Sequence, residues 1–253
     1  MARVTVLIST MGERINNIIL PCFNADVLYI IVHQQPLAPF SFDRDDVFYI
    51  ASFERGLSKS RNIAIKHCST KYGFICDDDV LIGVEGLISA VDAAECNGSD
   101  ILACRFVYSD GNMNSYPADG FIYGITSVAS VCSIEILINI DSLRRQFVFF
   151  DEQFGLGTPL PSGEEFIFLT DALRSGLEIR HSSCVVCTHP PITSGMDFFS
   201  TKEKILAKRH MLIRVFGSWA PLVMLIFFAK KSRVLIANKR LIFFAKIFFS
   251  IKG

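Results

Sequence analysis

The stretch KYGFICDDDVLI, residues 71–82, combines the pattern of a buried strand with three consecutive aspartates, Asp77, Asp78 and Asp79. Apolar residues lead up to the aspartates and resume after them, which predicts a buried strand that ends in an acidic turn. Carboxylates so close together repel one another, and a hard, oxygen-preferring cation such as Mg²⁺ or Mn²⁺ offsets that repulsion. A solvated acidic turn or a helix cap is the alternative interpretation.

The net charge of zero hides two parts of opposite charge. Residues 1–200 hold 13 Lys and Arg against 24 Asp and Glu, a net charge of −11. Residues 201–253 hold 12 Lys and Arg against one acid, Glu203, a net charge of +11. We therefore expect one domain over residues 1–200 and a basic, apolar helical tail over residues 201–253. The acidic body argues against nucleic acid as a partner, because phosphate backbones require a basic face.

The cysteines and the N-terminus indicate a reducing compartment. Eight scattered cysteines, most of them in apolar runs, are typical of reduced thiols that serve as small core residues. Cys184 and Cys187 form one CxxC without a second pair, so core packing is favoured over a zinc site. The first apolar run is too short for a signal peptide before Glu13 and Arg14. We expect a cytoplasmic protein.

The first hundred residues alternate between strand and helix patterns. Continuous apolar, β-branched runs predict parallel strands that are covered on both faces. We expect strands at residues 3–9, 27–33, 46–50, in the run before Asp77 and at 100–107, with helices at 12–22, 58–67 and 84–96. This alternation predicts an open, mostly parallel α/β sheet with helices on both faces.

The middle of the chain is less regular. We expect a loop or hairpin at residues 109–123, a strand at 127–134, a helix from about 163 to 174 and a strand at 179–188. Residues 151–163 hold three glycines and two prolines, which predicts a mobile loop before that helix. Ligands of open α/β sheets bind at the carboxyl ends of the strands, where the acidic turn and this loop can both lie.

The tail has the composition of a membrane-surface segment. Residues 211–229 are apolar apart from Arg214 and Ser218, but Gly217 and Pro221 interrupt the run. Lysine and arginine recur among short apolar blocks after it, so an interfacial anchor that lies in the membrane plane is favoured over a transmembrane helix. Packing of the tail on the domain or in a dimer contact is the alternative.

Three segments carry a resemblance to a known family. They are GLSKSRNIAI (56–65), CDDDV (76–80) and FGLGTPLPSGEEFIFLTDALRSG (154–176). In this order they resemble the GT-A glycosyltransferases of the family 2 type, over roughly residues 3–190. The resemblance implies the GT-A fold, an open sheet that binds a nucleotide-diphospho-sugar.

The resemblance assigns the acidic turn to a metal and the donor. Asp79 is the main expected ligand of Mn²⁺ or Mg²⁺, with Asp77 toward the donor or the metal and His189 as a third ligand. Asp78 is assigned to the donor side or to support of the turn. A departing nucleoside diphosphate carries charge that a divalent Lewis acid neutralises. For His189, a structural role is the alternative.

Further donor contacts are expected from residues near the first strand and from the RN segment. Ser9, Thr10 and Arg14 lie where the family has its nucleotide-binding loop, and Arg61 can reach the donor or pair with an aspartate of the turn. The alternative for Arg61 is a surface helix arginine. The second strand ends in VHQQ (32–35), where relatives commonly carry an acidic residue, so the nucleotide is less defined.

The acidic pair Glu164 and Glu165 is the catalytic candidate. An inverting transfer needs a base that takes the proton of the acceptor hydroxyl, and Glu165 is the expected base. A favourable interaction of both glutamates with the helix dipole is the alternative.

These expectations combine into one functional hypothesis. The chain is expected to be a metal-dependent inverting glycosyltransferase with a nucleotide-sugar donor, foremost a UDP-sugar, and a saccharide or lipid-linked acceptor. Surface-polysaccharide or glycolipid synthesis, peripheral on the inner face of the cell membrane, is the expected setting. The alternatives are a nucleotidyltransferase, for which residues 9–14 are poor in glycine, and a non-catalytic membrane-associated scaffold.

Overall fold

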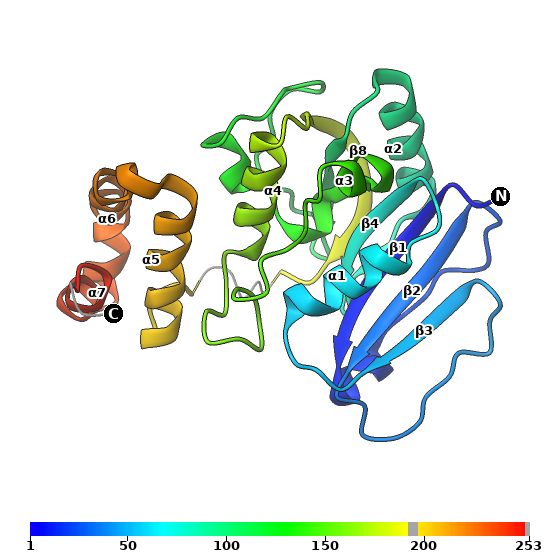
Figure 1. Ribbon diagram of the computed structural model, residues 1–253, viewed down its shortest axis with the longest axis horizontal. Helices are drawn as coiled ribbons and strands as arrows, with labels where there is room; N and C mark the ends of the chain where they lie inside the picture. Colours follow the sequence, from blue (N-terminus) through cyan, green and yellow to red (C-terminus); the bar gives the residue numbers. More distant parts are fainter. Residues whose placement is uncertain (192–196, 251–253) are drawn as a thin grey trace.

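A mixed sheet of eight strands forms the centre of the computed structural model, which describes residues 1–191 and 197–250 (Figure 1). The strand order is β3-β2-β1-β4-β7-β6-β8-β5. The strands are β1 Val4–Met11, β2 Val27–Gln34, β3 Val47–Ser52, β4 Tyr72–Asp77, β5 Leu81–Ile82, β6 Ile101–Tyr108, β7 Ile136–Asn139 and β8 Ile179–His189.

Strand direction brings the ends of distant strands to one edge of the sheet. β1 to β4 are parallel, and β6 and β8 run in the same direction because β7 pairs antiparallel with both β4 and β6. The register pairs Ser9 with Asp77, and His189 ends β8. The carboxyl ends of β1, β4 and β8 therefore meet at the same edge, and the predicted mostly parallel α/β sheet is confirmed.

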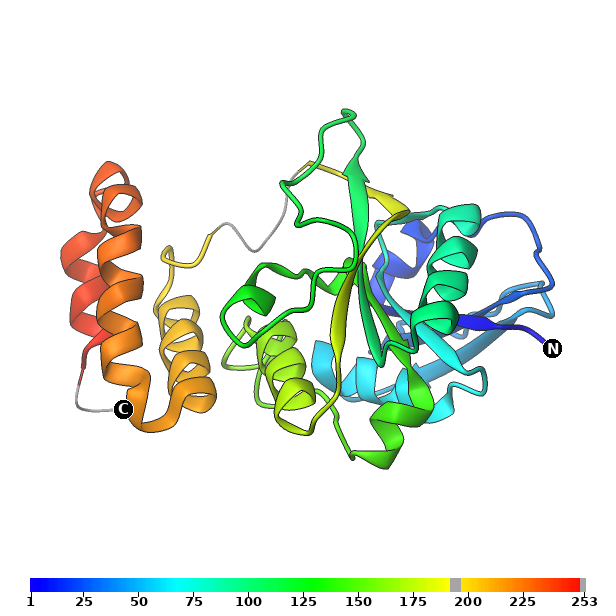
Figure 2. The ribbon, with the colours of Figure 1, turned by 90° about the horizontal axis from the view of Figure 1, so that it is seen from above.

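Helices cover both faces of this sheet (Figures 1 and 2). Side chains of β1 alternate between the two resulting cores, as the two-residue period of a strand requires. Leu7 packs in one core with Ile65 and Phe168, while Ile8 packs in the other with Leu87. The helices of the domain are α1 Leu57–His67, α2 Val84–Asn97, α3 Ile140–Arg145 and α4 Glu164–Arg174.

The predicted helix over residues 12–22 is wrong. Only a 3₁₀ helix forms there, at Gly12–Asn17, and it buries Ile15 while Ile19 is exposed. Pro21 has no N–H to continue a helix and restricts the residue before it, so the turn ends early despite the helical spacing of its isoleucines.

The predicted strand at residues 127–134 is also wrong. That segment forms two 3₁₀ helices, Ser127–Ser130 and Ser133–Glu135, and the strand begins only at Ile136. The Glu135 carboxylate accepts a hydrogen bond from the backbone N–H of Cys132 at 2.8 Å. This reciprocal cap closes the turn and outweighs the strand preference of its apolar residues.

The tail folds into three helices that pack side by side (Figures 1 and 2): α5 Lys202–Phe216, α6 Ala220–Ala237 and α7 Leu241–Phe248. Gly217, with φ of +52°, ends α5 and lets the chain reverse through a short 3₁₀ turn. The run Lys202–Ala237 is long and apolar enough to cross a membrane by length and composition alone.

The tail shares its core with the domain. Phe198, which precedes α5, lies 5.7 Å from Phe227 and 5.8 Å from Phe244, measured between ring centroids. Ile205 and Leu235 are fully buried in the same continuous cluster as the residues under α1 and α4. The division of the chain at residue 200 stays a prediction.

Candidate active site

Arg61 is the centre of the group of charged residues at the carboxyl edge of the sheet. Its side chain is 1% exposed. It donates from Nη2 to Asp77 Oδ1 at 3.1 Å, and from Nη1 to Glu165 Oε1 at 3.3 Å and Glu164 Oε1 at 3.5 Å. One guanidinium therefore joins the acidic turn to the start of α4.

The surroundings of Arg61 keep its guanidinium charged and fixed. Burial lowers the pKa of Arg61, but the carboxylates of Asp77, Glu165 and Glu164 outweigh it and raise the pKa above the usual value. The Phe150 ring lies 5.4 Å from the Arg61 guanidinium carbon, at cation–π distance. The buried, ion-paired arginine excludes the interpretation of Arg61 as a surface helix residue.

The two glutamates lie in different environments. The Glu164 side chain is 5% exposed and that of Glu165 is 24% exposed. Burial and the neighbouring Glu165 raise the pKa of Glu164, although Arg61 opposes the shift. A side-chain carbon at Gly155 would lie 3.3 Å from Glu164 Cδ, so the glycine allows its loop to pack against this carboxyl. Glu165 is the member of the pair that solvent and a substrate can reach.

The side chain of Asp78 points into the protein. It is 5% exposed and accepts hydrogen bonds from Thr10 Oγ1 at 2.7 Å and from Arg14, whose Nη2 also lies 3.3 Å from Asp79 Oδ2. Ser9 is buried as well, and its Oγ accepts a hydrogen bond from Ser60 at 2.9 Å. The contacts tie the end of β1 to the acidic turn, and the assignment of these residues to the donor stays a prediction.

Asp79 and His189 form the part of the site that can hold a cation. Asp79 is 40% exposed, and its Oδ1 lies 3.6 Å from His189 Nε2. Asp77 is engaged by Arg61 and, at 3.4 Å, by Ser133. Among residues 1–191 and 197–250, no three His, Cys, Asp or Glu side chains lie together as a metal cluster.

That pair still fits Mg²⁺ or Mn²⁺. These ions commonly use one or two protein ligands and complete their coordination with substrate phosphates and water. An exposed carboxylate beside an imidazole offers such an incomplete set of ligands, and the diphosphate of a donor would supply the rest.

Comparison with known structures supports the same fold. The crystal structure of S. aureus TarS 1–349 superposes with a TM-score of 0.59 at 15% identity and covers 85% of this chain and 66% of that chain. The TarS 1–349 complex with UDP-GlcNAc gives a TM-score of 0.60 at 14% identity, with 85% and 67% covered. The chain spans 40% of the longer TarS structure. Among curated proteins, none matches the sequence.

The sequence itself matches the family model described as Glycosyl transferase family 2 over residues 34–159. The chain belongs to the family 2 type of GT-A glycosyltransferases. The matched range includes the RN segment and the acidic turn, and it ends in the glycine-rich loop before Glu164.

Asn62, the second residue of the RN segment, has a role that the sequence did not reveal. Its Nδ2 donates to the Phe150 carbonyl at 2.9 Å and to Glu152 at 3.1 Å, and its Oδ1 accepts from the Phe150 N–H. These bonds fix the segment that carries the aromatic ring under Arg61. The RN segment therefore fixes two parts of the site, because Arg61 contacts the carboxylates and Asn62 holds the loop beside them.

Gln34 lies in the segment VHQQ (32–35), where the family resemblance implies an acidic residue. It is buried, and its Oε1 accepts a hydrogen bond from the Gly56 N–H at 2.8 Å. The side chain thus supports the start of α1 rather than facing open space.

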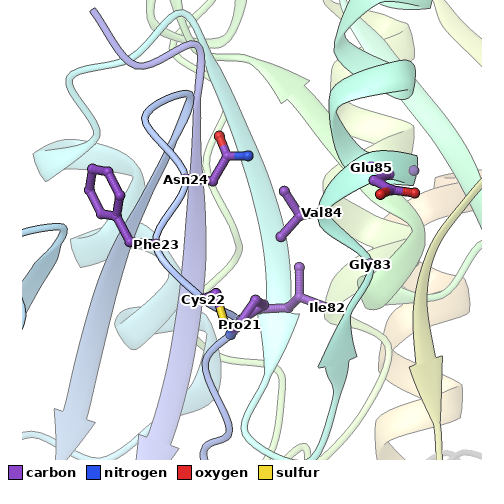
Figure 3. Close-up of a pocket in the computed structure, with 9 residues that line it drawn as sticks. Pro21, Cys22, Phe23, Asn24, Ile82, Gly83, Val84 and Glu85 are labelled. Atoms are coloured by element: carbon purple, nitrogen blue, oxygen red, sulfur yellow. The ribbon is translucent and has the colours of Figure 1, made fainter.

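A shallow pocket of about 520 Å³ lies between residues 21–24 and 82–86 (Figure 3). None of the predicted site residues lines this pocket.

Proposed function

We propose that this family 2 chain transfers a sugar from a nucleotide-sugar donor to a hydroxyl group, with Glu165 as the base. The observation that carries the proposal is the bridge through Arg61, which joins the Asp77 side of the acidic turn to Glu165. A donor on the turn and an acceptor beside Glu165 would then react across one short distance. The UDP-GlcNAc complex of TarS supports a UDP-sugar as the donor.

The proposed reaction is a direct displacement with inversion. Glu165 takes the proton of the acceptor hydroxyl, whose oxygen forms a bond to the anomeric carbon. The bond from that carbon to the diphosphate breaks, and the electron pair leaves with the nucleoside diphosphate. Arg61 holds the Glu165 carboxylate in place through the contact of 3.3 Å between Nη1 and Oε1.

Buried Glu164 has a supporting role in this proposal. The raised pKa of Glu164 favours its neutral form, which avoids a second negative charge beside the base. Arg61 is then shared mainly between Asp77 and Glu165. The positions of the two glutamates thus separate one accessible base from one buried neighbour.

We also propose that Asp79 and His189 hold Mn²⁺ or Mg²⁺ together with the donor diphosphate. The bound ion would neutralise charge on the departing diphosphate. Arg14, half exposed beside Asp79, contributes a further positive charge from the 3₁₀ helix after β1. Thr10 and Asp78 orient Arg14 through their hydrogen bonds.

The tail is proposed to lie on the inner face of the cell membrane, where a saccharide or lipid-linked acceptor of surface-polysaccharide or glycolipid synthesis would be reached. The support comes from α6 and the 3₁₀ turn before it, whose exposed residues include Trp219, Leu222, Leu225 and Ile226. Basic residues flank this apolar surface, as in helices that lie in the interface of an anionic membrane.

A donor panel tests the proposed reaction. The full chain is incubated with UDP-, GDP- and TDP-sugars, with Mn²⁺ or with EDTA, and release of the nucleoside diphosphate is measured with membrane extracts as the acceptor source. We expect UDP release that depends on the metal and on the extract. Inertness toward every sugar nucleotide would contradict the proposal, and turnover of a sugar phosphate with an NTP would favour a nucleotidyltransferase.

A further inference from the structure

Helix α5 of the tail lies beside α4, the helix that carries Glu165 (Figures 1 and 2). A side-chain carbon at Gly163, the residue before α4, would lie only 2.8 Å from the sulfur of Met211 in α5. The rings of Phe166 and Phe216 lie 6.2 Å apart, measured between centroids. The tail therefore contacts the chain directly before and directly after the candidate base.

Arg214 of α5 joins two points of the chain that lie on either side of Glu165 in the sequence. Its Nη1 and Nη2 donate to the two carboxylate oxygens of Asp171 at 3.2 and 2.7 Å, and its Nε lies 3.4 Å from Asp151 Oδ2. Asp151 begins the glycine-rich loop, and Asp171 lies in α4 after the candidate base. One guanidinium of the tail therefore holds both ends of the segment that carries Glu165.

The middle of this segment is attached to α1 instead. The Leu57 N–H donates to the Leu156 carbonyl at 2.9 Å, and Ser58 Oγ donates to the Phe154 carbonyl at 2.6 Å. Helix α1 also carries Arg61, which contacts the Glu165 carboxylate. The segment between residues 151 and 171 is thus held by α1 within its loop and by α5 at its two ends.

The pair with Asp171 defines the direction of α4, which the contact at Gly163 alone does not. A helix that is held at one end only can tilt or rotate about that end. Asp171 lies about 9 Å along the helix axis from Glu165 at 1.5 Å per residue, so Arg214 fixes a second point. A tilt or rotation of α4 would turn the Glu165 side chain away from its position, and small displacements of a reacting group cost a large part of the rate.

We propose that Arg214 is a positioning residue for the transfer, and that it acts through the segment between Asp151 and Asp171 to hold Glu165 in its productive orientation. This role rests on the proposed function, because Glu165 is the proposed base. Arg61 holds the carboxylate of Glu165, whereas Arg214 holds the backbone that carries it. A planar guanidinium suits the task, because it pairs with Asp171 through two nitrogens and reaches Asp151 with the third. The tail is then a part of the catalytic unit as well as a membrane attachment.

Donor kinetics test this role. UDP release by the full chain is measured against the concentration of the UDP-sugar that gives the highest release, with membrane extract in excess. We expect Arg214→Met to lower kcat about tenfold or more, while the donor KM and the affinity for UDP stay within about twofold. Arg214→Lys keeps the charge of the tail and can pair with one carboxylate, so it should recover part of the lost kcat.

Two further substitutions separate positioning from the loss of a charge. Arg3 precedes β1 at the opposite edge of the sheet, and it also pairs with two carboxylates, Asp92 at 2.6 Å and Glu95 at 2.7 Å. Arg3→Met is therefore the matched control and should leave kcat unchanged. Asp171→Asn should lower kcat, and its addition to Arg214→Met should cost little more, because both substitutions remove the same pair.

Amide hydrogen exchange tests the attachment without turnover. Arg214→Met should exchange faster than wild type across residues 151–171, and Arg3→Met should not. With an active wild type, an unchanged kcat of Arg214→Met, a loss seen only as a higher donor KM, or unchanged exchange in this segment would overturn the role of Arg214 alone. A wild type that releases no UDP from any sugar nucleotide would refute the reaction, and with it the role of Arg214, even where exchange in the variant is faster.

Discussion

Replacement of Arg61 by methionine removes the residue that joins the two acidic segments of the site. Methionine keeps a similar length and apolar stem, and it can still lie against the Phe150 ring. The guanidinium is lost, and with it the contacts at 3.1 Å to Asp77, 3.3 Å to Glu165 and 3.5 Å to Glu164. The change therefore isolates the charge of Arg61 from its packing.

The expected loss of stability is large because the remaining carboxylates are only partly solvated. Removal of one partner of a buried ion pair commonly costs about 3–5 kcal/mol. Glu164 is the most buried of the three carboxylates, so it dominates the cost when ionised. Arg61→Lys keeps the charge but loses the planar guanidinium that reaches both Asp77 and Glu165. Its loss of stability should therefore be smaller than that of Arg61→Met.

The pH dependence of the stability difference between wild type and Arg61→Met provides a second check, because its sign is defined. Burial raises the pKa of folded Glu164 above its unfolded value, so the folded state holds this proton more tightly and its contribution to stability is lost as pH rises. Arg61 lowers this pKa, and the methionine variant raises it further. The deficit of Arg61→Met relative to wild type should therefore be smaller at about pH 6 than at about pH 9, because wild-type Glu164, with a pKa of about 8, ionises between these values while that of the variant stays protonated.

Urea unfolding of wild type, Arg61→Met and Arg61→Lys at the two pH values measures these differences. We expect a deficit of about 3–5 kcal/mol for Arg61→Met near pH 9, reduced near pH 6. Unchanged unfolding midpoints at both pH values, or a deficit that grows on acidification, would refute the bridging role of Arg61.

The other predictions concern the metal, the α4–α5 contact and the tail. Mn²⁺ should raise the UDP affinity of the wild type about tenfold or more in calorimetry, and Asp79→Asn should abolish this gain. An unchanged gain in the variant would exclude Asp79 as a ligand. Gly163→Ala should cost about 2–4 kcal/mol in urea unfolding, because φ is +102° and the added carbon meets a sulfur at 2.8 Å. Gly176→Ala, with φ of +83° and open space around it, should lose only about 1 kcal/mol, and equal losses would refute the contact. The pair of substitutions Leu222→Ser and Ile226→Ser should reduce flotation with anionic vesicles without loss of helix by circular dichroism, whereas full flotation would contradict the membrane assignment.

The sequence predicted the elements whose signal is local. The strand before Asp77 and the helix that begins at Glu164 both lie within one or two residues of their expected positions. The edge of the sheet that gathers Asp77, Glu165 and His189 followed from parallel strand direction and from the family resemblance.

Tertiary contacts decided what the sequence could not. Nothing local distinguishes Glu164 from Glu165, because the difference in burial depends on Arg61 and on the close approach of Gly155. No local pattern shows that α5 packs on the start of α4, where a side-chain carbon at Gly163 would lie 2.8 Å from the sulfur of Met211.

The most direct test of the account compares sugar transfer by wild type, Glu165→Gln and Glu164→Gln, with UDP affinity measured in parallel. We expect Glu165→Gln to lower the transfer rate about 10²–10⁴-fold while UDP affinity stays within about twofold. Glu164→Gln, which mimics the neutral form of a buried carboxyl, should retain most of the rate. Transfer by Glu165→Gln at the wild-type rate would contradict the account.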